Sequence, residues 1–246
     1  MRALDRLKRS LRKRALFRRF GQHWKPEGEA FQKRSYDSYE AYLEHQKAKL
    51  ETHQFGQYDE EFRTALRERL TSLDLEWQGR NVLCLGARIG SEVKAFLDLG
   101  AFAVGIDLNP GEANRYVVQG DFHNLQYAPS SIDVVYTNSL DHAFDIDRLA
   151  QEVLKVLKPD GLFLVEAVQG RDQGINPGFF ESFFWKNIDE LVRVFEKVGF
   201  KASSRTPMTH PWPGEQICLS RSGSNRRPNT IRDAQDHTQW FARLDS

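Results

Sequence analysis

Cysteine, long apolar runs and net charge are all scarce in this sequence of 246 residues. Its two cysteines, Cys84 and Cys218, lie in apolar runs typical of strands, so we expect two reduced thiols in the core and a cytosolic setting. No apolar run approaches the roughly 18 residues that a membrane helix needs. The sequence also shows no internal repeat and no spacing typical of metal ligands, so we expect no metal site.

The net charge of +1 indicates no charged partner for the chain as a whole, but the charge is unevenly distributed. Residues 1–20 hold nine Lys or Arg and one acid, so this segment carries +8 and the rest of the chain −7. No apolar segment follows the basic start, so we expect no secretory signal. This basic arm is a solvated, partly disordered segment, an organelle presequence, or a helix that contacts an anionic membrane or, less favoured, nucleic acid. We therefore expect a cytoplasmic protein, with peripheral membrane contact as an open alternative.

Patterns along the chain divide it into four parts: a basic arm at 1–20, a helical extension at 21–78, an α/β domain at 79–221 and a disordered tail at 222–246. Within the extension, residues 21–35 look irregular, and apolar residues recur at helical spacing in 36–53 and 59–73. Three tyrosines near the start of the first helix either line a substrate mouth or only pack: Tyr36, Tyr39 and Tyr42.

From residue 81 onward, short apolar runs alternate with helical patterns, which predicts a parallel sheet with helices on both faces. Helices are expected at 91–99, 146–157 and 187–200. In such sheets, ligands bind beyond the carboxyl ends of the strands. The first five strands expected are Val82–Leu85, Ala103–Ile106, Arg115–Val118, Ile132–Thr137 and Leu162–Ala167.

The loop after the first of these strands contains two glycines. Gly86 allows a sharp turn, and Gly90 allows the backbone to pass close to a ligand before a helix begins. Asp107 ends the next strand 21 positions after Gly86, near the spacing of a carboxylate that binds both ribose hydroxyls. A dinucleotide pyrophosphate favours G-x-G-x-x-G, whereas this loop has only G-x-x-x-G, so a cofactor without phosphate is preferred.

Four segments, taken in order, resemble the class I S-adenosylmethionine-dependent methyltransferases of the type 11 kind. They are VLCLGARIG from Val82, GIDLNP from Gly105, GDFHNLQYAPSSIDVVYTNSLDH from Gly120 and LKPDGLFLV from Leu157. The resemblance implies an α/β fold with a Rossmann-like, seven-stranded, mostly parallel sheet, helices on both faces and an antiparallel last strand. It also implies S-adenosyl-L-methionine as the cofactor.

The resemblance implies cofactor contacts at each of these loops. Gly86 and Gly90 would hold the methionine part, and Asp107, with Leu108 beside it, would hold the ribose. The contacts further along the chain would be Asp121 to the adenine amino group, Phe122 packing nearby, and Asn138 at the tip of the fourth strand. Only 13 residues separate Asp107 from Asp121, so we expect a short loop there and an unusually exposed adenine side.

Two positions depart from the family pattern. Cys84 stands where the family often has an acid, and Arg88 stands where it often has a glycine. Glu92 either replaces the missing contact to the cofactor ammonium or only favours the helix dipole. Arg88 either pairs with the methionine carboxylate or points to solvent.

Methyl transfer to a hydroxyl also benefits from a base, since the protein otherwise mainly holds the acceptor and the methyl group in line. His142 is the first candidate because imidazole titrates near neutral pH, and Asp141 either orients it or acts instead. Residues 170–185 follow the fifth strand and are rich in aromatics, which either form a lid over the acceptor or anchor the next helix.

We expect methyl transfer to a small molecule or glycan/lipid precursor. The alternative is a non-catalytic cofactor-binding protein that docks a membrane or nucleic acid through its basic arm.

Overall fold

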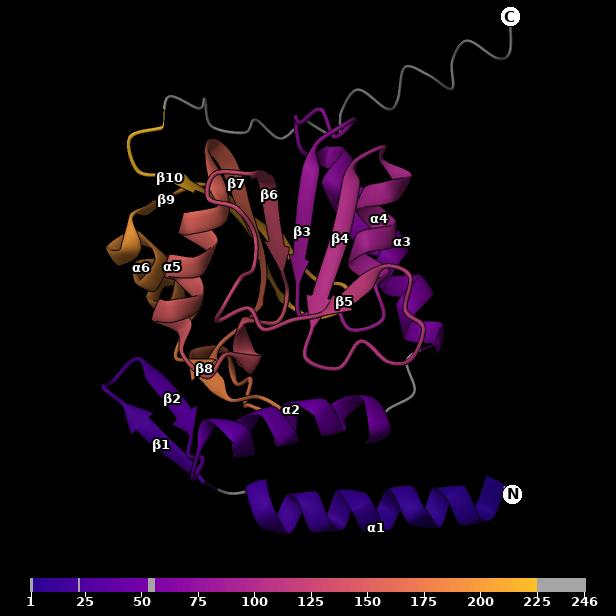
Figure 1. Ribbon diagram of the computed structural model, residues 1–246. Helices are drawn as coiled ribbons and strands as arrows, with labels where there is room; N and C mark the ends of the chain where they lie inside the picture. Colours follow the sequence, from indigo (N-terminus) through magenta and orange to yellow (C-terminus); the bar gives the residue numbers. More distant parts are fainter. Residues whose placement is uncertain (1, 22, 53–55, 225–246) are drawn as a thin grey trace, which may run out of the picture.

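The computed structural model describes residues 2–21, 23–52 and 56–224. A seven-stranded sheet with the order β5-β4-β3-β6-β7-β10-β9 forms its centre (Figure 1). Strand β10 runs antiparallel to both of its neighbours, and the other strands are parallel, which confirms the expected fold class. The strands are β3 (Asn81–Leu85), β4 (Phe102–Asp107), β5 (Val117–Gln119), β6 (Ile132–Thr137), β7 (Leu157–Val168), β9 (Phe200–Met208) and β10 (Gly214–Arg221).

Helices cover both faces of this sheet, because successive residues of a strand point to opposite sides. Val82 and Cys84 of β3 pack toward α3 (Gly56–Ser72) and α4 (Ser91–Asp98), whereas Leu83 and Leu85 pack toward α5 (Ile146–Val156) and α6 (Ile188–Val198). Figure 1 shows the two helix pairs on opposite sides of the strands. Cys84 and Cys218 are buried free thiols in the α3–α4 layer, as expected.

The segment 21–35 is not irregular, so that expectation is wrong. It forms a hairpin of β1 (Trp24–Glu27) and β2 (Phe31–Arg34), and β2 pairs with β8 (Phe183–Trp185) in a second, three-stranded sheet. Two short 3-10 turns, Leu140–His142 and Arg171–Gln173, complete the elements. The hairpin thus fastens the N-terminal extension to the loop that follows β7.

Helix α2 (Tyr39–Thr52) lies across the carboxyl ends of the parallel strands, and α1 (Arg2–Phe20) lies beyond it (Figure 1). Residues 2–20 of the basic arm therefore form a helix, whose Leu16 and Phe20 are buried in a cluster with Ala41, Ala48 and Phe180. In the described part of the chain, no helix has the length and apolar character needed to cross a membrane. Residues 225–246 of the predicted disordered tail lie outside the described residues.

Arg34 is a buried guanidinium that joins three segments. It donates hydrogen bonds to the carbonyls of Glu181 (2.8 Å), Phe179 (2.9 Å) and Gly178 (3.1 Å), and also to that of Phe20. These bonds tie β2 to the end of α1 and to the loop before β8. Because a guanidinium presents five donors in a fixed fork, a single side chain can serve several carbonyls.

We predict that Arg34→Met lowers the free energy of unfolding by about 2–4 kcal/mol, since hydrogen bonds to charged groups contribute roughly 1.5–3 kcal/mol and the carbonyls stay buried. Urea denaturation measures the change. The control is Arg19→Met, which removes an exposed ion pair with Glu44 and should cost less than about 1 kcal/mol. Equal losses for both variants would contradict the role of Arg34.

Candidate functional site

The turn between β3 and α4 is built on glycine. Gly86 has a φ of +68°, and a Cβ atom added there would lie 2.7 Å from the Cβ of Ser139, so both conformation and space demand glycine. Gly90 has a φ of +89°, and a Cβ atom added there would lie 2.8 Å from the Cβ of Tyr116. Arg88, at the centre of the loop, also has a positive φ of 45°. The loop therefore packs closely against the start of β5 and against the residues that follow the end of β6.

Asp107 ends β4 beside this turn. Its carboxylate accepts the backbone N–H of Arg88 at 3.0 Å and that of Asn109 at 2.8 Å, one on each oxygen. Burial raises the pKa of Asp107, and the two backbone bonds oppose that rise. Each oxygen can accept a further bond, so the carboxylate suits two neighbouring hydroxyls.

A cavity lies where α2 crosses the strand ends. Most of the cofactor contacts expected from the sequence line it: Gly86, Arg88, Asp107, Leu108, Asp121 and Phe122. Its other walls come from α2 and two neighbouring loops: Tyr42, Gln46, Lys49, Asn109, Gly120, Ser139 and His142. We call this space the first cavity.

Asp121 lies in the first cavity, but its carboxylate is already engaged. It accepts hydrogen bonds from the hydroxyl of Tyr39 and from the backbone and ring nitrogens of His123, at 2.8 and 2.9 Å. Burial by itself raises the pKa of Asp121, but these hydrogen bonds together lower it by more, so the pKa lies below its ordinary value. An adenine amino group bound to Asp121 would therefore share the Asp121 carboxylate with the hydroxyl of Tyr39.

The connection from β4 to β5 is a loop without a helix, as its short length predicts. The expectation of an exposed adenine side is wrong, because α2 covers it. The side chain of Asn109 donates to the carbonyl of Lys47 at 2.8 Å, and Tyr42 of α2 is fully buried against the first cavity. The extension supplies the cover that the short loop cannot.

A second cavity adjoins the first. The two share four lining residues, Lys49, Arg88, Ser139 and His142, and we call this shared boundary the junction. The remaining walls of the second cavity are Asn138, Asp141, Glu166, Val168, Ile175, Asn176, Gly178, Glu181, Phe184, Trp185 and Trp212. Arg88 thus lies at the junction instead of pointing to solvent.

Three residues expected at the cofactor do not line the first cavity. Asn138 lines the second cavity instead. Glu92 is not among the described residues that line either cavity; it is buried behind Asn138, whose side-chain amide donates to it at 3.3 Å. Burial raises the pKa of Glu92 to about 7. Gly90 shapes the turn without lining a cavity, again among the residues described. Neither Glu92 nor Gly90 gives direct support for its expected contact.

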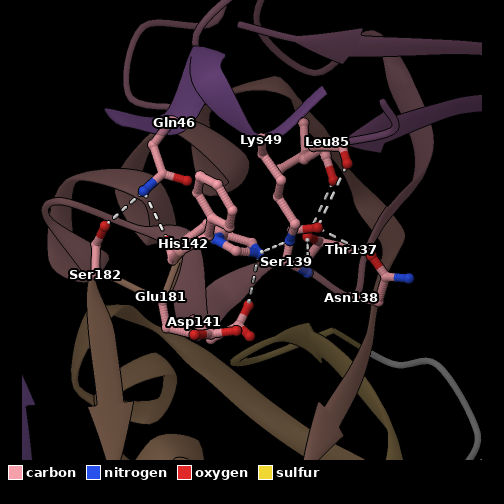
Figure 2. Close-up of polar contacts among 12 residues, drawn as sticks. Gln46, Lys49, Leu85, Thr137, Asn138, Ser139, Asp141, His142, Glu181 and Ser182 are labelled. Carbon is pink, nitrogen blue, oxygen red and sulfur yellow. Dashed lines mark hydrogen bonds and ion pairs between the residues drawn. The ribbon is translucent and has the colours of Figure 1, made fainter. Parts of the chain in front are cut away.

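His142 is held by two hydrogen bonds that fix its tautomer (Figure 2). Its Nδ1–H donates to the carbonyl of Phe180 at 2.9 Å, because a carbonyl can only accept. Its Nε2 therefore accepts from the ammonium of Lys49, which lies 2.7 Å away. Burial and the charge of Lys49 keep the pKa of His142 well below its ordinary value. Since the lone pair of the neutral ring is engaged by Lys49, His142 is poorly placed to act as a base.

Asp141 and Glu181 face the second cavity beside this pair (Figure 2). The Oδ1 atom of Asp141 lies 3.8 Å from Nε2 of His142. Burial and the nearby Glu181 carboxylate raise the pKa of Asp141 to about 7. Donor atoms of Asp141, His142 and Glu181 lie within 4.8 Å of one another, close enough to surround a cation. In this structure the cation at the imidazole nitrogen is the Lys49 ammonium.

The sequence pattern singled out Tyr42 and the segment 170–185, but it did not single out Gln46 and Lys49 of α2 or Glu181 of the loop before β8. Tyr42, Gln46 and Lys49 follow one another at i, i+4 and i+7, so one helix face supplies them to the site, and that spacing was visible in the sequence. Glu181 is a lone acid within the aromatic run FFESFF, which was also visible. Within this run, Phe183 packs in the core with side chains of α6, and Phe184 lines the second cavity.

Comparisons with known proteins give a consistent picture. Residues 83–165 match the family model described as a methyltransferase domain. A Mycolicibacterium smegmatis protein named "Probable S-adenosylmethionine-dependent methyltransferase" is 26% identical over 147 residues, which cover 54% of this chain and 56% of that protein. The 24-methylenesterol C-methyltransferase 2 of Oryza sativa subsp. japonica is 25% identical over 178 residues, which cover 58% of this chain and 47% of that protein. The chain thus spans about half the length of the curated relatives it matches.

Solved structures show the same fold at low identity. The 1,6-didemethyltoxoflavin-N1-methyltransferase of Burkholderia thailandensis, solved with 1,6-didemethyltoxoflavin and S-adenosylhomocysteine, superposes with a TM-score of 0.57 and 16% identity, over 82% of this chain and all of that one. The glycopeptide N-methyltransferase MtfA, solved with S-adenosylmethionine, gives a TM-score of 0.50 and 17% identity over 65% of this chain and 93% of that one.

We predict that His142 stays neutral, with its proton on Nδ1, from pH 5 to pH 8, because burial and Lys49 both oppose a second proton. In Lys49→Met the pKa of His142 should rise toward its ordinary value of about 6.5, since one opposing charge is gone. Long-range ¹H–¹⁵N NMR spectra of the imidazole report both the tautomer and the titration. Lys47→Met, on the same helix, should leave the titration unchanged. Protonation of His142 near pH 6.5 in the unmodified protein would refute this geometry.

Proposed function

We propose that the chain is a class I S-adenosylmethionine-dependent methyltransferase and that it transfers the methyl group of S-adenosylmethionine to a small molecule bound in the second cavity. The observation that supports this most directly is the junction, because it brings the cavity lined by the expected cofactor residues into contact with a second cavity. Such contact is what an in-line transfer between two bound molecules requires.

The residues of the first cavity fit the cofactor. Asp107 offers both oxygens to the ribose hydroxyls, and Phe122 and Leu108 give the adenine apolar walls. Gly86 forms the turn at the wall of the first cavity, where we place the methionine part, and Arg88 can pair with the methionine carboxylate. When bound, S-adenosylmethionine supplies an electrophilic methyl group on a positively charged sulfur.

Asp141, and not His142, is the better candidate for a base. The ring nitrogen of His142 that could accept a proton is bonded to Lys49, whereas Oδ1 of Asp141 is buried at the second cavity without a hydrogen-bond partner. A carboxyl group whose pKa lies near 7 is matched to proton transfer at neutral pH. Burial and the charge of Arg88 lower the pKa of Lys49 to about 8, so at neutral pH it stays a cation and holds His142 in place.

Docking through the basic arm is not favoured as the main function. The contact of α1 with an anionic membrane stays a prediction, supported by Leu11 and Phe17, which are exposed among basic side chains. Transfer to a lipid acceptor, the reaction named in the sterol methyltransferase relatives, would give such a contact a purpose.

We predict that Asp107→Asn weakens S-adenosylhomocysteine binding by about 10- to 100-fold, because it replaces a charged acceptor of two hydroxyls by a neutral amide of the same shape. Isothermal titration calorimetry measures the affinity. Glu112→Gln, an exposed acid in the following loop, serves as the matched control and should bind normally. Unchanged affinity in Asp107→Asn would show that the ribose lies elsewhere.

We further predict that methyl transfer slows about tenfold per pH unit below pH 7, as Asp141 takes up a proton and stops accepting one. Asp141→Asn should be about 10²- to 10⁴-fold slower and should lose this pH dependence. The measurement is S-adenosylhomocysteine release, followed across pH with the first small-molecule acceptor that supports turnover. If His142→Gln abolishes the pH dependence while Asp141→Asn keeps it, the base has been misassigned. If no acceptor supports turnover in protein that binds S-adenosylhomocysteine, the proposed catalysis is wrong.

A further inference from the structure

The second cavity has charges of opposite sign on different parts of its wall. Its two cations, Lys49 and Arg88, belong to the junction with the first cavity. Its acids, Asp141, Glu166 and Glu181, line the second cavity alone. A molecule that fills the second cavity therefore meets carboxylates beyond the junction.

Only two of these three acids are available to a ligand. Glu166 is already neutralised, because Arg69 donates to both of its oxygens at 2.7 and 2.8 Å and Gln216 adds a third bond at 2.9 Å. In contrast, Oδ1 of Asp141 and Oε2 of Glu181 are buried atoms without a hydrogen-bond partner. Buried carboxylate oxygens without partners are costly, and a bound cation removes much of that cost.

The rest of the wall suits an organic body attached to that cation. Phe184 and Trp185 stack with ring centroids 5.3 Å apart, and both line the cavity with Val168 and Ile175. Aromatic faces attract cations as well as apolar groups. The indole N–H of Trp212 is buried at the same cavity without a partner, so it can donate to an oxygen of the ligand.

We infer that the methyl acceptor is a small organic amine with an apolar body, bound as an ammonium between Asp141 and Glu181. This inference rests on the proposed function. A divalent metal fits the same three donor groups less well, because it would need the Nε2 lone pair of His142, which Lys49 occupies at 2.7 Å.

The chemistry balances with the groups present. The ammonium gives one proton to the Asp141 carboxylate and becomes a neutral amine with a free lone pair. That lone pair forms the new N–C bond while the C–S bond breaks and its electron pair stays on sulfur. The product is an N-methyl ammonium, so the positive charge moves from sulfur to nitrogen, and Glu181 remains ionised to hold it.

The test uses the full chain saturated with S-adenosylhomocysteine and a panel of matched probes: 2-phenylethylamine, tryptamine and hexylamine, each with the corresponding alcohol. Calorimetry should show at least one amine binding about tenfold or more tightly than its alcohol. Glu181→Gln should remove at least about tenfold of the amine affinity and leave the affinities for the alcohol and for S-adenosylhomocysteine unchanged. Glu60→Gln, an exposed acid on α3, is the control and should change nothing.

A second arm follows transfer of the labelled methyl group from S-adenosylmethionine, which should appear on amine nitrogen. A panel in which no amine binds more tightly than its alcohol overturns the inference, and so does methyl transfer confined to the alcohols. Binding of Mn²⁺ alone that Glu181→Gln abolishes also overturns it, in favour of a metal centre. Failure to bind S-adenosylhomocysteine at all would instead contradict the proposed function, so the two failures are distinguishable.

Discussion

The close contact between Gly86 and Ser139 is the constraint on which the site depends. Because β3 and β6 are neighbours in a parallel sheet, their carboxyl ends meet at one edge, and a left-handed turn without a side chain lets the two loops touch. This contact brings the backbone of Arg88 to Asp107 on one side and aligns Asn138 to His142 on the other. Two cavities with a shared boundary follow from that single approach.

The N-terminal extension completes what the sheet begins. Helix α2 lines the first cavity with Tyr42, and its Lys49 engages the nitrogen of His142 that would otherwise accept a proton. The hairpin and Arg34 hold the loop that carries Glu181 against the same helix. In the proposed reaction, the extension helps to enclose the cofactor and leaves Asp141 open to the acceptor, so we propose for Asp141 the role that the sequence first suggested for His142.

The sheet was predictable because its strands and helices carry local periods, and the order of the glycine turn, Asp107 and Asp121 placed the cofactor contacts along it. The hairpin was missed because β2 pairs with β8 about 150 residues later, and Phe31 opposite Trp185 leaves no local pattern. The cover over the adenine was missed for the same reason. Glu92 has the right distance along the chain, but only the structure shows it buried behind Asn138.

We propose that the reacting sulfur lies where the two cavities meet. A crystal structure of the protein with S-adenosylhomocysteine tests this most directly. We expect the ribose hydroxyls on Asp107 and the sulfur at the junction formed by Lys49, Arg88, Ser139 and His142, facing the second cavity. A nucleoside bound away from Asp107, or a sulfur directed away from the second cavity, would contradict it.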